Sequence, residues 1–198
     1  IKDIDHIVFA GMGGSGTIGD IFSSILSKRQ THTTVVKGYH LPKTVNDRTL
    51  VVCTSISGNT DETLSILNES KTSNGKFIAF SSGDMMEEFC KKNTIKHYKI
   101  EKIHSPRASF TNFLYGIINT LEAILPIKRS DVLESISILD ITKKNISSEN
   151  LIRVVNLSNL KPNIKCLRAL RAIGFNLSSF LKYFLSSLFF ISDSLTPG

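Results

Sequence analysis

The chain has 198 residues, of which 41% are hydrophobic and 21% are charged. This composition is typical of a globular protein and excludes disordered, collagenous and disulfide-stapled chains. The net charge of +7 suits an anionic partner without distinguishing nucleic acid from a sugar phosphate. The three cysteines form no C-x-x-C pair, and no apolar stretch reaches the roughly 18 to 20 residues of a membrane span. We therefore expect a cytoplasmic protein without a membrane partner.

Short apolar runs alternate with Gly/Ser turns and helical patterns in the first half of the chain. The runs, each predicted to be a strand, occupy residues 4–10, 33–36, 50–53 and 76–80. Strands that alternate with helices form parallel βαβ units, with helices on both faces of the sheet. The predicted fold class is therefore α/β, with ligands expected at the carboxyl ends of the strands, where the Gly/Ser turns lie.

Helix starts and one long helix are also indicated. Asn59 lies three residues before Glu62, and Asp84 lies three residues before Glu87, a spacing that predicts a capping box at each helix start. Apolar residues recur at helical spacing over 110–125, and Pro126 predicts the end of that helix. A cluster of lysines between residues 91 and 102 indicates a solvated face rather than a nucleic-acid surface.

The remainder of the chain is expected to form a separate unit. We predict a first domain over residues 1–128, a linker or helix over 129–148 and a partial second domain over 149–198. The Phe/Ser-rich tail after Phe175 traces one apolar helical face, which favours a helix packed on the domain or on a partner chain. A membrane-surface helix and an off-frame tail are the alternatives.

The first Gly/Ser turn has the sequence GMGGSG over residues 11–16, called here the glycine turn. It fits the G-x-G-x-x-G pattern, but the acidic residue that dinucleotide-binding folds carry about 20 positions later is replaced by the Val35-Val36-Lys37 segment. A Walker loop is excluded because no Gly-Lys-Ser/Thr follows. The glycine turn is predicted to meet an anion or a sugar hydroxyl at a helix start, or else to serve only as a tight turn.

The second turn has the sequence TSISGNT over residues 54–60, called here the serine turn. Ser55, Ser57 and Thr60 place three hydroxyls at the start of a helix, where amides and the helix dipole attract an anion. The turn contains no basic residue, which suits a small monophosphate such as a sugar phosphate. Helix capping alone is the alternative. The glycine turn one βαβ unit earlier favours phosphate binding.

Four segments in this order resemble the successive signatures of the sugar isomerase (SIS) domain family, and are most similar to archaeal-type bifunctional phosphoglucose/phosphomannose isomerases. They are the glycine turn, the serine turn with Glu62 and Thr63, the SSG sequence of residues 81–83, and the SPRAS sequence of residues 105–109. The resemblance runs from about Asp5 to Leu125. It implies a three-layer SIS domain with a parallel sheet flanked by helices, followed by an incomplete or diverged second SIS domain.

The resemblance also implies a role for individual residues. By it, Ser55, Ser57 and Thr60 would bind the phosphate, whereas Gly13, Gly14 and Ser15 would contact the sugar. Arg107 would lie beside C1 and C2 of the substrate, where its guanidinium stabilises an enediolate. The alternative for Arg107 is a solvent-exposed loop residue after Pro106.

The implied reaction is the isomerisation of glucose 6-phosphate or mannose 6-phosphate to fructose 6-phosphate, by a homodimer that needs no metal or other cofactor. The family takes its base, a glutamate, from the second SIS domain. Here the segment Leu167–Phe175 resembles the one that precedes this base, but Asn176-Leu177-Ser178 follows instead of Asn-Glu-Asn. The base is therefore expected in an incomplete or diverged second half. A non-catalytic phosphosugar-binding module or regulator is the first alternative, and a nucleotide-dependent oxidoreductase, opposed by the absent ribose-binding acid, is the second.

Overall fold

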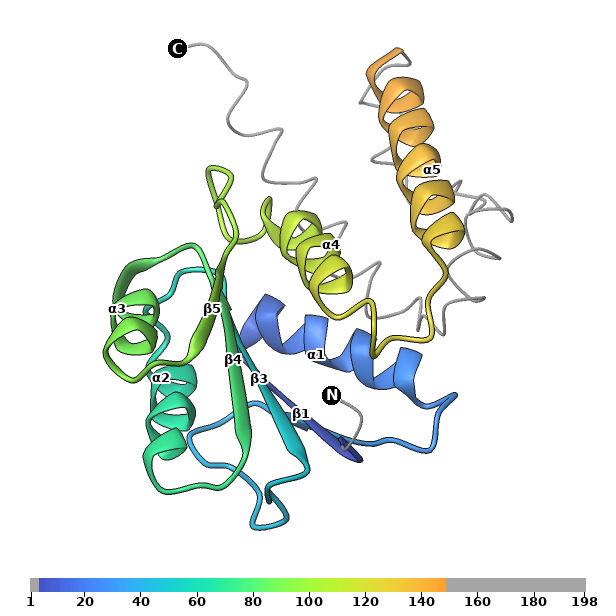
Figure 1. The fold of residues 1–198 in the computed structure, drawn as a ribbon. Helices are drawn as coiled ribbons and strands as arrows, with labels where there is room; N and C mark the ends of the chain where they lie inside the picture. The colour runs from blue at the N-terminus through green and yellow to red at the C-terminus, as the bar shows by residue number, and fades with distance from the viewer. Residues whose placement is uncertain (1–3, 149–198) are drawn as a thin grey trace, which may run out of the picture.

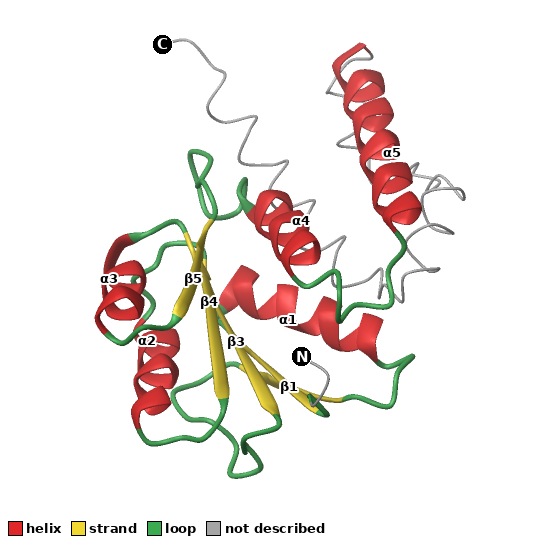
Figure 2. Ribbon diagram, viewed as in Figure 1, coloured by secondary structure: helices red, strands yellow, loops and turns green. Residues whose placement is uncertain are grey.

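The computed structural model describes residues 4–148, which form one parallel sheet with helices on both faces (Figures 1 and 2). The sheet order is β2-β1-β3-β4-β5, and every pairing is parallel. The strands are β1 (His6–Ala10), β2 (His32–Val36), β3 (Thr49–Ser55), β4 (Lys76–Ser81) and β5 (Lys96–Lys99). The helices are α1 (Gly13–Leu26), α2 (Asp61–Asn68), α3 (Asp84–Lys92), α4 (Phe110–Thr120) and α5 (Arg129–Ser148), with a short 3₁₀ helix, η1 (Glu69–Lys71), after α2.

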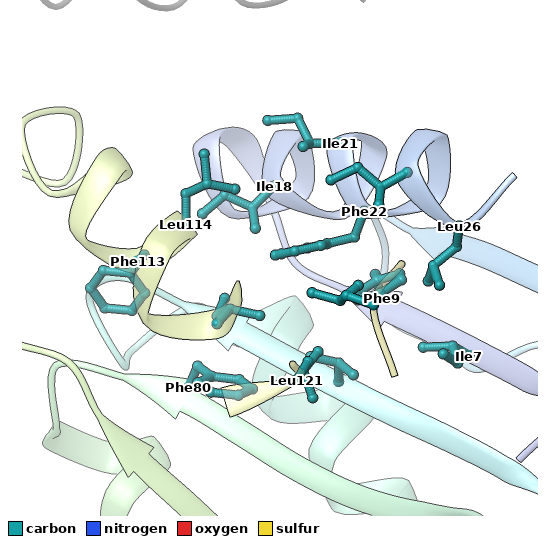
Figure 3. Close-up of a cluster of buried hydrophobic side chains, with 14 of the residues drawn as sticks. Ile7, Phe9, Ile18, Ile21, Phe22, Leu26, Phe80, Phe113, Leu114 and Leu121 are labelled. Atoms are coloured by element: carbon teal, nitrogen blue, oxygen red, sulfur yellow. The ribbon is translucent and has the colours of Figure 1, made fainter. Parts of the chain in front are cut away.

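Two hydrophobic clusters fill the space between the three layers. Helices α1 and α4 cover one face of the sheet, and α2 and α3 cover the other (Figure 1). Under α1 and α4 the core combines isoleucine and leucine side chains with four phenylalanines; Phe9 stacks on Phe22, and both Phe80 and Phe113 are fully buried (Figure 3). Under α2 and α3 the buried residues are smaller, and both buried cysteines, Cys53 and Cys90, lie there. The predicted α/β fold with a three-layer arrangement is confirmed.

The sequence did not predict β5, and it placed the end of α4 too late. Strand β5 has the sequence Lys-His-Tyr-Lys, in which exposed lysines stand at both ends and leave no apolar run to recognise. Charged edge strands of this kind discourage pairing with another sheet. Helix α4 ends at Thr120 rather than at Leu125, although Leu121 and Leu125 remain buried in the turns that follow.

Neither predicted capping box is present. Helix α3 begins at Asp84 with Gly83 as its N-cap, and no side-chain capping bond is formed there. Glu87, the expected partner in that box, instead binds Lys91 and Lys99 at 2.7 and 2.9 Å. These two hydrogen bonds lower the pKa of Glu87 to about 2. A capping box was the wrong interpretation because two lysine side chains compete for the same carboxylate.

Helix α5 occupies the region predicted to be a linker or helix. It is tied to α4 by a hydrogen bond of 2.9 Å between the hydroxyls of Tyr115 and Ser135. The predicted partial second domain and the Phe/Ser-rich tail lie outside the described residues. Within residues 4–148, no helix has the length and apolar character that crossing a bilayer requires.

Candidate functional site

The glycine turn, the serine turn and the turn after β4 meet at the carboxyl edge of the sheet. They follow β1, β3 and β4, which are neighbours in the sheet and parallel, so their carboxyl ends share one edge. This edge is where parallel α/β sheets bind ligands. Each of the three turns leads into a helix start, at Gly13 for α1, at Asp61 for α2 and at Asp84 for α3.

Three hydroxyl groups of the serine turn lie within hydrogen-bonding distance of one another. Ser55 Oγ is 2.9 Å from Thr60 Oγ1 and 3.4 Å from Ser57 Oγ, and Ser57 Oγ is 3.4 Å from Thr60 Oγ1. Ser55 is buried, whereas Ser57 and Thr60 are partly exposed. The structure therefore brings together the three residues predicted to bind phosphate, with two of them accessible from solvent.

The start of α2 lies directly behind these hydroxyls. Thr60 is the N-cap residue of α2, but its side chain makes no capping bond and lies against Ser55 instead. Two further amides of the turn point toward the hydroxyl cluster, because Gly58 donates to Ser55 Oγ at 3.0 Å and Asn59 donates to Ser57 Oγ at 3.3 Å. Amides and hydroxyls at a helix N-terminus are the groups that bind an anion without a basic side chain.

Ser15 joins the glycine turn to the serine turn. Its buried side chain accepts a hydrogen bond from the Ile56 amide at 3.3 Å. Gly11 allows the close approach of the two segments, because a Cβ there would lie 2.8 Å from the Thr54 carbonyl oxygen. Gly13 opens α1 with a φ of +52° and open space around it, and Gly14 faces the ring of Phe110. Of the three predicted sugar contacts, Ser15 thus lies against the serine turn, and Gly13 and Gly14 directly precede Ser15 in the glycine turn.

Arg107 lies on the turn that precedes α4, and its side chain is exposed. Ser109, the N-cap residue of α4, fixes this turn by donating to the Ser105 carbonyl at 2.7 Å and accepting from the Ile103 amide at 2.9 Å. Phe110 follows at once and packs toward Gly14. The segment that carries Arg107 therefore approaches the glycine turn.

The turn after β4, residues 81–83, supports the serine turn from the other side and is called here the β4 turn. Gly58 has a φ of +76°, and a Cβ on it would lie 2.2 Å from the Gly83 carbonyl oxygen, which no side chain tolerates. The buried Ser81 hydroxyl accepts from the Gly83 amide at 3.1 Å and lies 2.8 Å from His97 Nε2. The sequence indicates residues 81–83, whereas no pattern in it points to His97.

Charged groups surround the three turns rather than line them. Lys37, at the end of β2, lies against Gly16 and pairs with Asp20 at 2.6 Å. Lys99 lies near Gly83 and pairs with Glu87. Among residues 4–148, no group of three or more His, Cys, Asp or Glu side chains is placed to hold a metal ion.

Residues 1–125 match the model of the SIS domain. The chain is 37% identical over 147 residues to the bifunctional phosphoglucose/phosphomannose isomerase of Thermoplasma acidophilum, a match that covers 74% of this chain and 44% of that protein. It is 40% identical over 117 residues to the protein of the same name from Aquifex aeolicus, covering 58% and 37%. The chain thus spans half or less of the length of these curated relatives.

Solved structures share the fold. A candidate phosphosugar isomerase from Bacillus subtilis matches with a TM-score of 0.56 and 19% identity, covering 74% of this chain and 47% of the other. The tagatose-6-phosphate ketose/aldose isomerase of Escherichia coli matches with a TM-score of 0.50 and 15% identity, covering 71% and 43%. At this level of identity the likeness concerns the fold alone.

Proposed function

The chain belongs to the SIS domain family, and we propose that its serine and glycine turns bind a phosphorylated hexose. The observation that carries this proposal is the cluster of three hydroxyls within 3.4 Å of one another, in Ser55, Ser57 and Thr60, at the start of α2. These groups donate hydrogen bonds to phosphate oxygens, and the helix dipole adds attraction for the negative charge. Gly13, Gly14 and Ser15 then contact the sugar.

The reaction we propose is the isomerisation of glucose 6-phosphate or mannose 6-phosphate to fructose 6-phosphate. The names of the relatives from Thermoplasma acidophilum and Aquifex aeolicus support this choice of substrates. The Arg107 guanidinium stabilises the negative charge of the enediolate, since fixed donors aimed at a developing oxyanion lower the barrier of the step. The protein acts as a cytoplasmic homodimer, without metal or nucleic acid.

The step between C1 and C2 also needs a base, which is usually a carboxylate in this type of proton transfer. We assign it to the second domain, proposed to begin after the first domain of residues 1–128 and the connecting segment 129–148. A non-catalytic phosphosugar-binding module is the second candidate function. The sequence Asn176-Leu177-Ser178 favours it, because it stands where a glutamate is expected between two asparagines.

The proposal is tested by measuring fructose 6-phosphate binding to the full 198-residue chain by calorimetry, with inorganic phosphate and NAD as competing ligands. Replacing Ser57→Ala together with Thr60→Ala removes two hydrogen-bond donors, so affinity is expected to fall by about tenfold or more. The matched control is Ser70→Ala with Thr72→Ala, which changes the same residue types beyond the other end of α2. An unchanged affinity in the first variant would remove the phosphate site, and preferential binding of NAD would favour an oxidoreductase.

A further inference from the structure

We propose, on the basis of the phosphate site proposed above, that His97 is a positioning residue which acts through Ser81 to hold the β4 turn against Gly58 of the serine turn. His97 lies on the edge strand β5, one strand beyond the turn that it supports. Its Nε2 is 2.8 Å from the hydroxyl oxygen of Ser81, the last residue of β4. The ring is partly buried, whereas Ser81 is fully buried.

Ser81 converts this contact into a fixed shape of the β4 turn. Its hydroxyl accepts a hydrogen bond from the Gly83 amide at 3.1 Å and lies 3.0 Å from the Gly83 carbonyl oxygen, to which it can donate. Gly83 and Asp84 both have positive φ values, of 135° and 55°. A backbone in such sparsely populated conformations persists only where its surroundings hold it. The Ser81 side chain is placed to hold Gly83, and the Asn59 side chain lies 3.4 Å from Asp84 Oδ2.

The β4 turn in turn holds the serine turn. The contact between Gly58 and the Gly83 carbonyl is too close for any Cβ, so the two backbones move together. The Met86 amide donates to the Gly58 carbonyl at 3.0 Å, and the Met85 amide donates to Asn59 Oδ1 at 3.2 Å. Any shift of the β4 turn therefore displaces the backbone between the hydroxyls of Ser57 and Thr60.

The hydroxyl of Ser81 has one proton, which it can donate either to the Gly83 carbonyl or to His97 Nε2. Which of the two accepts it depends on whether Nε2 carries a hydrogen. When Nε2 carries a hydrogen, the imidazole donates to Ser81 and leaves the Ser81 proton for the Gly83 carbonyl. Burial lowers the pKa of His97, Glu87 opposes this shift and Lys99 and Lys91 add to it, so the neutral ring prevails at neutral pH. For the Nε2-protonated tautomer, a donor at this position is the property that a substitute must reproduce, and the side-chain amide of glutamine has one.

The first part of the test uses the ligand-free 198-residue chain and amide hydrogen exchange. In His97→Leu, exchange at the Gly58 and Met86 amides is expected to become about tenfold faster, the effect of losing one buried hydrogen bond. His97→Gln should restore it to within about threefold of the native rate. Amides of β1 should not change in either variant. Native rates at Gly58 and Met86 in His97→Leu, or an equal effect of leucine and glutamine, would overturn the proposal.

A double-mutant cycle shows whether His97 acts through Ser81. If it does, Ser81→Ala combined with His97→Leu accelerates exchange no more than the larger single change. Additive effects would overturn the proposed route. Should His97→Leu fail to fold, Ser81→Ala carries the same exchange test, because it removes the group that both His97 and Gly83 bond. His40→Leu is the control, since the His40 side chain is 87% exposed and lies beside Glu69.

Affinity for fructose 6-phosphate completes the test. It is expected to fall about tenfold in His97→Leu and to recover in His97→Gln. Faster exchange with unchanged affinity would overturn the role of His97 in binding. If the native chain is folded but does not bind fructose 6-phosphate, the proposed function fails, while the exchange rates still decide whether His97 positions the serine turn.

Discussion

At the amino end of the sheet, two threonine hydroxyls bond the ring of His6, whereas at the carboxyl end the hydroxyls of the serine turn bond one another. His6 Nε2 lies 3.0 Å from Thr34 Oγ1, and His6 Nδ1 lies 3.3 Å from Thr49 Oγ1. Both ring nitrogens are thus occupied, and the ring is buried. In the serine turn the same kind of group has only another hydroxyl or a turn amide as its partner.

This difference separates a structural cluster from a binding site made of similar atoms. A hydroxyl pair can release its mutual bond and donate to phosphate oxygens, because a rotation of each hydroxyl is enough. The threonines at the amino end would leave a buried imidazole without partners if they turned away, which carries a large desolvation penalty. A cluster of hydroxyl groups is therefore not enough to indicate a binding site. The hydroxyls must also be able to exchange their present hydrogen-bond partners for a ligand.

The largest effect is expected for Gly58→Ala, which disrupts the serine turn at the carboxyl end of the sheet. Both the φ of +76° and the 2.2 Å approach to the Gly83 oxygen exclude a Cβ, so the serine turn and the β4 turn must separate. We expect fructose 6-phosphate affinity to fall by about a hundredfold or more and stability by about 2 kcal/mol. Calorimetry and chemical denaturation measure the two effects.

The matched control is Gly38→Ala. An added Cβ at Gly38 meets nothing within 4 Å, and Gly38 is not among the glycines with positive φ. Alanine there should leave affinity unchanged and stability equal or slightly higher, since it restricts the unfolded chain. Equal losses in the two variants would mean that the contact between Gly58 and Gly83 has no special importance.

An effect of intermediate size is expected on the pH dependence of stability, from His6 at the amino end of the sheet. Burial lowers the pKa of His6, nearby His32 lowers it further, and Asp5 opposes the shift. Because the folded-state pKa of His6 lies below the unfolded value of about 6.5, the stability that neutral His6 contributes is complete above that pH and is lost as the pH falls from it through the folded-state pKa. Burial also lowers the pKa of His97, so its contribution has the same sign. We expect thermal unfolding to occur at progressively lower temperature below about pH 6.5.

His32→Gln isolates the part that belongs to the histidine pair. The two rings lie 4.8 Å apart, and His32 is exposed, so the substitution removes a repelling charge without opening the core. The pKa of His6 should then rise toward its ordinary value, as measured by NMR titration of the ring protons, and the loss of stability on acidification should shrink. A His6 pKa that stays the same would mean that His32 does not contribute to it.

The fold and the site could be predicted to different depths. Strands β1, β3 and β4 and the α/β class follow from apolar runs that end in Gly/Ser turns, because a strand buried on both faces needs such a run. Strand β5 lacks one and was missed. That the hydroxyls of Ser55, Ser57 and Thr60 lie together could be predicted because their spacing is local, within one turn.

Contacts between segments distant in the chain could not be predicted from the sequence. The pairing of His97 with Ser81 joins residues 16 positions apart on neighbouring strands, and nothing in either local pattern indicates it. The approach of Gly58 to Gly83 depends on the order of β3 and β4 in the sheet. The predicted capping boxes failed for the same reason, since Lys99, from another strand, competes for Glu87, and Asn59 Oδ1 accepts from the Met85 amide of α3.

The smallest effects are expected for the exposed ion pair at each end of the sheet. Arg48 pairs with Asp5 at 3.0 Å at the amino end, and Lys37 pairs with Asp20 at 2.6 Å at the carboxyl end, with all four side chains about half exposed. Each alanine variant, Arg48→Ala and Lys37→Ala, should lose less than about 1 kcal/mol of stability, and less still at high salt. Denaturant titrations at two salt concentrations measure this.

Only Lys37→Ala should also change ligand binding. Lys37 lies against Gly16 in the first turn of α1, so its charge contributes to the field that a phosphorylated sugar meets, whereas Arg48 lies at the opposite end of the sheet. We expect affinity to fall by about two- to threefold in Lys37→Ala at low salt and to stay unchanged in Arg48→Ala. An equal fall in both variants would show that net charge, rather than position at the carboxyl edge, governs the attraction of the ligand.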